Sequence, residues 1–157
     1  YVSVDYGTLN PFSAGLWCVT KQGAVRIKEY YHSGRRTNIQ KTDEEYYQAL
    51  RDLAKGYNVD YVIVDPSAAS FITTIFRHGE FQVVKANMYG IRRTSVYLKD
   101  GRLKIHRSCK DAIREFRLYR WDEDSTVDKV IKEDDHAMDD IRYFCNTIMV
   151  RHFPVMR

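Results

Sequence analysis

Residues 59 to 66 read Val59-Asp60-Tyr61-Val62-Ile63-Val64-Asp65-Pro66. Most of this run is apolar and β-branched, which is typical of a central strand that is covered on both faces. Pro66 stops the run, because proline has no N–H to donate to a strand ladder. The stretch therefore predicts a sheet with a buried middle strand and helices packed on both of its faces.

The residues before this strand predict three more strands. The alternating, β-branched pattern Tyr1-Val2-Ser3-Val4-Asp5 is typical of a strand. Lys21-Gln22-Gly23 predicts a hairpin turn between strands at residues 14–20 and 24–31. Residues 32–41 are polar and predict a loop.

Helices are expected on either side of the central strand. Thr42-Asp43-Glu44-Glu45 is a capping box, in which Thr42 accepts from the Glu45 amide and Glu45 reaches back, and it predicts a helix to about Lys55. Ser67 is expected to cap a second helix over residues 68–77. The remaining expected elements are a strand at 81–85, helices at 91–99, 108–119 and 135–150, a short segment at 103–105 and an acidic loop at 121–133.

Element order and composition together predict one α/β domain with a mixed sheet over residues 1–157. The chain is 44% hydrophobic, which excludes wholesale disorder, and no apolar run approaches the roughly 20 residues of a membrane span. Its three cysteines are odd in number and widely spaced. They form neither a disulfide framework nor a zinc pattern, which suits a reducing compartment.

Charge is unevenly distributed along the chain, whose net charge is +4. Eleven Lys and Arg residues lie between residues 85 and 120, and nine Asp and Glu residues follow between 121 and 140. A metal-dependent enzyme acting on nucleic acid needs both, since basic groups hold phosphates and acidic groups hold cations. Solvated helix faces are the simpler explanation of any one charge run.

Asp5 and Asp65 each lie at the carboxyl end of a predicted strand, where sites form in open α/β sheets. If the two strands are neighbours, about 4.8 Å apart, the carboxylates can share a cation. Turn chemistry would explain either residue alone, because Asp5 precedes a Gly turn and Asp65 precedes Pro66. Two such strand ends in one chain favour a site.

A third acidic group reads Asp134-Asp135-His136-Ala137-Met138-Asp139-Asp140. On a helix, His136 lies one turn from Asp139 and Asp140, so an imidazole and a carboxylate can face one ion. Helix capping explains the first two acids, but not the two that lie deeper. Oxygen-rich ligands with one His and no Cys favour Mg²⁺ or Mn²⁺. Two such ions would activate a water and stabilise the leaving oxygen in phosphodiester cleavage.

These stretches resemble a known family. Val2-Ser3-Val4-Asp5-Tyr6-Gly7, Ile63-Val64-Asp65-Pro66-Ser67-Ala68 and His136-Ala137-Met138-Asp139-Asp140-Ile141-Arg142-Tyr143 are similar to motifs in the nuclease domain of tailed-phage large terminase subunits, in particular those of Gram-positive phages and prophages. The resemblance covers essentially the whole chain. It implies an RNase H-like fold and a two-metal endonuclease that cuts concatemeric viral DNA when packaging starts and ends.

The resemblance also assigns the site. It implies that Asp5, Asp65, Asp139 and His136 are the catalytic, metal-binding residues for two Mg²⁺ or Mn²⁺ ions. A helical projection places Asp139 nearly opposite the apolar face and Asp140 beside it, and does not choose between them. The resemblance assigns Asp139 to the metal and Asp140 to a supporting position behind the ligands.

The partners implied by the resemblance are double-stranded DNA, the terminase ATPase domain, the small terminase subunit and the portal protein, in the host bacterial cytoplasm and without a membrane. No Gly-x-x-x-x-Gly-Lys-Ser/Thr loop occurs in the chain, so we expect the N-terminal packaging ATPase domain to be absent from it. The candidate DNA-backbone contacts are Arg92, Arg93, Lys104, Arg107, Lys110 and Lys132.

Two other functions remain open at this point. A junction resolvase of the same fold also uses clustered acids, and a DNA-binding module could retain the fold with an inactive site. Metal-dependent nicking of plasmid DNA separates the nuclease from the binding module.

Overall fold

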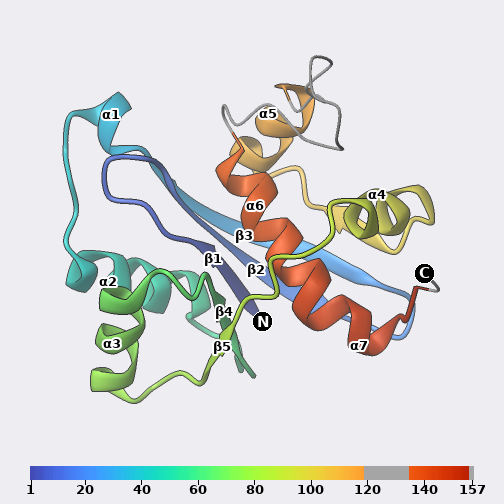
Figure 1. Cartoon of the computed structure of the whole chain (residues 1–157), viewed down its shortest axis with the longest axis horizontal. Coiled ribbons are helices and arrows are strands. Elements are labelled where there is room, and N and C mark those ends of the chain that lie inside the picture. Colours follow the sequence, from blue (N-terminus) through green and yellow to red (C-terminus); the bar gives the residue numbers. More distant parts are fainter. Residues whose placement is uncertain (119–134, 156–157) are drawn as a thin grey trace.

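The chain folds around one six-stranded sheet in the computed structural model, which describes residues 1–118 and 135–155 (Figure 1). Across the sheet the strand order is β5-β4-β1-β2-β3-β6. Parallel and antiparallel neighbours both occur, so the predicted α/β fold with a mixed sheet is confirmed. The strands are β1 (Val2–Asp5), β2 (Phe12–Val19), β3 (Ala24–His32), β4 (Val62–Val64), β5 (Val83–Lys85) and β6 (Leu103–Ile105).

The apolar stretch that predicts a central strand forms β4, whose three residues are all buried. This strand runs parallel to β1, with Val4 in register with Val64, while β1 runs antiparallel to β2. The short segment at 103–105 is the edge strand β6, which pairs in parallel with β3. Three residues are too few for a periodic pattern, so only the pairing identifies this segment as a strand.

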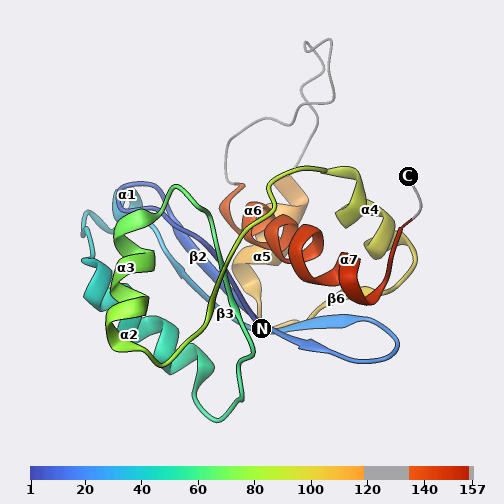
Figure 2. The same cartoon turned by 60° about the horizontal axis from the view of Figure 1, so that its bottom comes forward.

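Helices cover both faces of the sheet (Figure 2). On one face lie α2 (Asp43–Ala54) and α3 (Ala69–His78), which pack over Val2 and Val4. On the other lie α4 (Arg92–Lys99), α5 (Lys110–Leu118) and α6 (His136–Phe144). Side chains alternate along a strand, so Ser3 and Asp5 of β1 point toward α6. This alternation places polar residues of a central strand beneath one particular helix.

The two predicted helix starts differ in outcome. The capping box at α2 is confirmed: Thr42 Oγ1 accepts from the Glu45 amide at 3.2 Å and Glu45 Oε2 accepts from the Thr42 amide at 2.8 Å. The Ser67 cap is wrong, because α3 begins after Ala68 without a side-chain cap. Instead the Ser67 amide donates to Asp65 Oδ1 at 2.8 Å, so Asp65 closes the turn after β4.

Two helical segments also differ from expectation. The predicted loop at 32–41 contains a single turn, α1 (Gly34–Thr37), because Ser33 Oγ accepts from the Arg36 amide at 3.3 Å. The predicted regular helix at 135–150 is α6 followed by a π-helical stretch, η1 (Cys145–Met149), and the short α7 (Val150–His152). None of the helices in the described part of the chain is both long and apolar enough to cross a membrane.

Candidate active site

Asp5 and Asp65 lie at the same edge of the sheet, on neighbouring strands. Asp5 ends β1, and Asp65 directly follows β4, one residue beyond the paired Val4 and Val64. Parallel neighbours are about 4.8 Å apart, and residues in register point to the same face. The expectation that these two strands are neighbours is therefore met, and both carboxylates face the side of the sheet that α6 covers.

Helix α6 brings two groups onto these carboxylates. His136 Nδ1 lies 2.8 Å from Asp5 Oδ2, and the Tyr143 hydroxyl lies 3.3 Å from Asp5 Oδ1 and 3.5 Å from Asp65 Oδ2. His136 and Tyr143 are seven residues apart, which is close to two helical turns, so both project from one side of α6. The Tyr143 hydroxyl thus contacts the carboxylates at both strand ends. Its position in the sequence, beside the apolar face of the helix, gives no sign of this contact.

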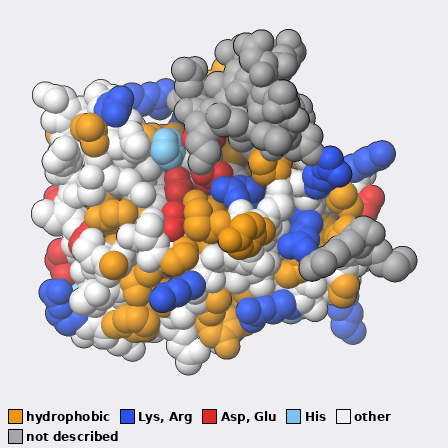
Figure 3. Space-filling model, viewed as in Figure 1, with side chains coloured by type: hydrophobic (Ala, Val, Ile, Leu, Met, Phe, Trp, Pro, Cys, Tyr) orange, Lys and Arg blue, Asp and Glu red, His pale blue; other side chains and the backbone are white. Residues whose placement is uncertain are grey.

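An open pocket of about 630 Å³ collects all of the predicted metal-binding residues. Figure 3 shows Asp and Glu side chains gathered in a hollow at this end of the sheet, beside a histidine. The turn after β1 forms part of the wall, and Arg35 of α1 joins it because the Arg35 amide donates to the Leu9 carbonyl at 3.1 Å. The lining residues are Asp5, Tyr6, Gly7, Thr8, Leu9, Asn10, Arg35, Asp65, Met88, Asp135, His136, Asp139 and Tyr143.

Asp139 faces the pocket and is bound by an arginine one turn along the helix. Its Oδ1 accepts from Arg142 Nη2 at 2.8 Å and from Arg142 Nε at 3.2 Å. Both side chains are partly exposed, at 14% for Asp139 and 13% for Arg142. Arg142 Nη1 also donates to the backbone carbonyl of Met88, which lines the same pocket.

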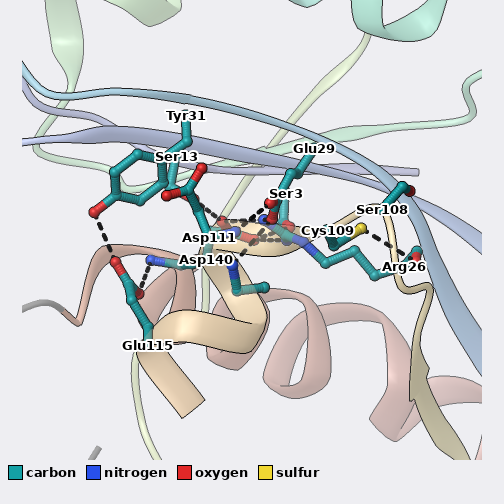
Figure 4. Close-up of polar contacts among 12 residues, drawn as sticks. Ser3, Ser13, Arg26, Glu29, Tyr31, Ser108, Cys109, Asp111, Glu115 and Asp140 are labelled. Atoms are coloured by element: carbon teal, nitrogen blue, oxygen red, sulfur yellow. Dashed lines mark hydrogen bonds and ion pairs between the residues drawn. The ribbon is translucent and has the colours of Figure 1, made fainter. Parts of the chain in front are cut away.

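Asp140 points the other way, into a buried polar network (Figure 4). Its two oxygens accept from Arg26 Nη1 at 2.5 Å and Nη2 at 3.0 Å, and from Ser3 Oγ at 2.7 Å and Ser13 Oγ at 2.5 Å. The side chains of Asp140 and Arg26 are both fully buried. A Cβ on Gly15 would overlap the Arg26 guanidinium, so glycine there makes room for it. The structure thus places Asp140 outside the pocket, behind Asp139.

A buried glutamate fixes the start of α6. Glu115 Oε2 accepts from the amides of Ala137 and Met138, at 2.6 and 3.1 Å, and its Oε1 accepts from the Tyr31 hydroxyl at 2.7 Å (Figure 4). A carboxylate at a helix N-terminus satisfies amides that have no partner within the helix. Burial raises the pKa of Glu115 to about 7, against the effect of these hydrogen bonds. Sequence patterns do not identify this cap, because it comes from another helix.

The electrostatics of the pocket reflect burial first and the neighbouring charges second. Burial raises the pKa of Asp5 to about 6; the His136 hydrogen bond opposes this, and the charges of Asp139 and Asp140 add to it. Burial alone would lower the pKa of His136, but the hydrogen bond and charge of Asp5 raise it overall. A bound cation would relieve the repulsion among these carboxylates.

The donor set suits a hard divalent cation, since it consists of carboxylate oxygens with one imidazole and no thiolate. Within residues 1–118 and 135–155, however, no three His, Cys, Asp or Glu side chains converge closely enough to form a metal-holding group. The contacts explain this: Asp5 is paired with His136, and Asp139 is paired with Arg142. The side chains therefore suit a hard divalent cation by type, but in this structure Asp5 and Asp139 bind other side chains of the protein.

The predicted DNA contacts lie away from the pocket, since none of those described lines it. Arg92 is exposed on α4, whereas Arg93 is partly buried and donates to Asn146 Oδ1 at 3.4 Å. Lys104 on β6 is exposed. Arg107 and Lys110 are exposed and line a shallow pocket with Arg114 and Arg117 at α5. Lys132 lies outside the described residues.

Sequence reasoning did not single out four groups that the structure places in or beside the site: Tyr143, Arg142, Arg35 and Glu115. One signal was present for two of them, since Arg142 and Tyr143 lie one turn beyond Asp139 on the same helix. Arg35 was within a segment expected to be a loop. No local pattern connects it, or Glu115, to the site.

Solved structures provide the comparison with known proteins. The large terminase of a thermophilic bacteriophage, in complex with ADP, is 40% identical over 95% of this chain with a TM-score of 0.90, and this chain spans 39% of its length. The same terminase in complex with ATP-γ-S gives the same identity and TM-score, with 95% of this chain and 40% of that one covered. No protein-family model matches the chain, and neither does any curated protein sequence.

More distant structures share the fold. The large-terminase nuclease domain of bacteriophage SPP1 with bound Mn is 19% identical, covers 90% of this chain and 83% of its own, and has a TM-score of 0.56. The nuclease domain of Thermus phage P74-26 is 13% identical, covers 91% and 76%, and has a TM-score of 0.67. At these identities the likeness shows the fold alone.

Proposed function

The chain is a relative of phage large terminases and has the fold of their nuclease domain, and on this premise we propose that it is a metal-dependent DNA endonuclease. Its reaction would be two-metal-ion hydrolysis of phosphodiester bonds, with Mg²⁺ or Mn²⁺. Its role would be to cut concatemeric viral DNA during genome packaging in the host bacterial cytoplasm. The ATPase domain, the small terminase subunit and the portal protein would be its partners, as the family resemblance implies.

One observation carries this proposal. Asp5 and Asp65, at the carboxyl ends of adjacent parallel strands, share one open pocket with His136 and Asp139 of α6. Asp139 is paired with Arg142 and Asp5 with His136, and a cation would add a shared positive charge in the partly buried pocket that the three carboxylates line. The SPP1 nuclease domain of the same fold was solved with bound Mn, which supports a divalent cation as that charge.

The residues of the pocket have distinct parts in such a reaction. Asp5, Asp65, Asp139 and His136 would hold the cations, which when bound supply an activated water and neutralise charge on the scissile phosphate. His136 orients the Asp5 carboxylate through the 2.8 Å contact, and the Tyr143 hydroxyl contacts both Asp5 and Asp65 from the helix side. Asp140 supports Asp139 from behind by fixing α6 to β1, β2 and β3.

The DNA backbone would be held outside the pocket by basic residues on the surface. Arg107 and Lys110 are the strongest of the predicted contacts, because they line one pocket together with Arg114 and Arg117 of α5. The next candidates for DNA contact are Arg92 and Arg93 of α4 and Lys104 of β6. A contact by Lys132 stays a prediction from the sequence.

Plasmid cleavage tests the proposal directly. Supercoiled plasmid is incubated with the protein and Mn²⁺, Mg²⁺ or EDTA, and nicked and linear products are quantified. Asp5→Asn and Asp139→Asn should each lower the metal-dependent rate by about 100-fold or more, because each removes a charged ligand at the reacting phosphate. Asp52→Asn is the matched control, since Asp52 is exposed on α2 and outside the pocket.

The outcomes separate the alternatives. Cleavage that survives EDTA, or that survives in both pocket variants, would reject a metal-dependent site at these residues. DNA binding without cleavage in either metal would favour a binding module with an inactive site. Preferential cutting of a four-way junction over linear duplex would favour a junction resolvase of the same fold.

A further inference from the structure

Asp139 is a proposed metal ligand whose charge is already matched by a guanidinium. Arg142 donates to the same oxygen of Asp139 through two nitrogens, at 2.8 and 3.2 Å. Two donors from one guanidinium fix the direction of a carboxylate more firmly than a single donor does. The orientation of Asp139 is therefore set by Arg142 and not by the other acids of the pocket.

This pairing accounts for the spacing of the donors in the pocket. Asp5 is engaged by His136 and Tyr143, while Asp139 is engaged by Arg142, so the carboxylates are directed at different partners. Among the described residues no three of them converge as a ligand group. A cation that uses both Asp5 and Asp139 meets a carboxylate whose Oδ1 already accepts two guanidinium donors, so it competes with Arg142 for the charge of Asp139.

Arg142 has partners other than Asp139, so it would keep some contacts if Asp139 turned toward a cation. Its Nη1 donates to the Met88 carbonyl, and its guanidinium carbon lies 5.2 Å from the centre of the Tyr143 ring. With 13% of its side chain exposed, it also reaches water. These contacts to Met88 and Tyr143 do not involve Asp139, so Arg142 can keep them when the carboxylate turns toward a cation.

We propose that Arg142 is an internal counter-ion that competes with the divalent cation for Asp139 and thereby sets the metal affinity of the site. The proposal rests on the proposed function, because it takes Asp139 to be a metal ligand. Metal loading is then an exchange of partners at Asp139, from guanidinium to cation. Arg142 is a positioning residue in this scheme, since it acts only through Asp139.

Removal of the guanidinium should tighten metal binding. Arg142→Gln leaves Asp139 without its ionic partner and removes one positive charge from beside the site, so the Kd for Mn²⁺ should fall by roughly three- to tenfold. Arg142→Lys keeps the positive charge but cannot donate the two hydrogen bonds that Arg142 Nε and Nη2 make to Asp139, so the Kd of this variant should fall by a smaller factor. Isothermal titration calorimetry with Mn²⁺, without DNA, measures both.

A matched charge control separates partner exchange from simple electrostatics. Arg35→Gln removes a positive charge from the wall of the same pocket, where Arg35 is exposed on α1, whereas the ion pair to Asp139 comes from Arg142. Its Kd should change less than that of Arg142→Gln. In an Asp139→Asn background the gain from Arg142→Gln should disappear, because the residue through which Arg142 acts has lost its charge.

Several results would overturn the proposal. An unchanged or weaker Mn²⁺ affinity in Arg142→Gln would mean that Arg142 orients Asp139 for the metal or is irrelevant to it. An equal gain in Arg35→Gln, or a gain that persists with Asp139→Asn, would reduce the effect to general charge. If the wild-type chain shows neither binding heat nor thermal stabilisation with Mn²⁺, the metal site of the proposed function fails as well. If it binds but Arg142→Gln does not bind more tightly, only the exchange at Asp139 fails.

Discussion

Asp139 and Asp140 are neighbours on α6, each carries an arginine partner, and yet the two pairs are opposites. Asp139 and Arg142 are partly exposed and belong to the same helix, three residues apart. Asp140 and Arg26 are fully buried and come from α6 and β3, with two serines completing the carboxylate's hydrogen bonds. Coulomb attraction is present in both pairs, so burial and the number of other donors make the difference.

The contrast teaches that one short acidic motif supplies both a proposed metal ligand, Asp139, and the buried residue that positions its helix, Asp140. A buried charge cannot leave its partner without a desolvation cost, so the Arg26–Asp140 pair fixes where α6 lies on the sheet. Separating a partly exposed pair costs less desolvation, so Asp139 is the acid that the proposed exchange with a cation can use. The position of the proposed metal ligand Asp139 is therefore set by the buried Asp140 beside it.

The largest effect on stability should come from breaking the buried pair. Asp140→Ala leaves the Arg26 guanidinium buried without its main acceptor, which should lower the free energy of unfolding by about 3–5 kcal/mol. Urea denaturation monitored by tryptophan fluorescence measures it. The paired replacement Arg26→Met with Asp140→Leu should recover part of the loss, because it removes both charges of the buried pair while Glu29 loses its 3.5 Å contact with Arg26. A loss below about 1 kcal/mol in Asp140→Ala would break the comparison.

An intermediate effect should come from the glutamate that caps α6. The pKa of Glu115 is about 7 in the folded chain against an ordinary value of 4.5. Between these values the unfolded chain releases its proton and the folded chain keeps it, so stability falls as pH rises from about 4.5 to 7, by at most about 3 kcal/mol. Glu115→Gln should flatten this part of the curve in urea denaturation at a series of pH values.

Asp5 provides the internal reference for that pH series. The pKa of Asp5 is raised to about 6, so Asp5 also makes stability fall with rising pH, in wild type and in Glu115→Gln alike. The difference in pH dependence between these two proteins therefore reports the contribution of Glu115. Identical slopes in wild type and Glu115→Gln would show that the carboxylate does not retain its proton in the folded chain.

The smallest effect should come from the partly exposed pair, Asp139 and Arg142. Arg142→Ala should lower the free energy of unfolding in EDTA by less than Asp140→Ala does, by about 1–2 kcal/mol, since a partly exposed guanidinium and its partner regain water when they separate. The same urea assay measures it alongside Asp140→Ala. A loss as large as that of the buried pair would erase the distinction between them, and with it the basis for partner exchange at Asp139.

Much of the fold followed from local patterns, and the exceptions have physical reasons. The apolar run at Val62–Val64 and the Thr42 capping box are signals within a few residues, and both were confirmed. The Ser67 cap failed because Asp65 competes for the same turn through its own side chain. Strand β6 depends on pairing with β3, which no pattern within three residues can reveal.

Within the candidate site the same division holds. Asp5 and Asp65 could be paired in advance, because strand ends of neighbouring parallel strands meet at one edge of a sheet. Tyr143 and Glu115 could not, since one touches both strand ends only after α6 has docked and the other caps that helix from α5.

The sequence by itself determined the identity of most elements, the acids at the strand ends and a helix that carries His136 with two further acids. The helical pattern alone did not determine which of those two acids faces the pocket, because Asp139 lies nearly opposite the apolar stripe and Asp140 flanks it, and either position leaves room for a pocket. The tertiary structure decided this through Arg26, which lies 114 residues before Asp140 and takes that carboxylate into the interior. Because the buried Arg26 guanidinium binds Asp140, the helix is oriented with Asp139 toward the pocket. Only the folded chain brings Arg26 and Asp140 together.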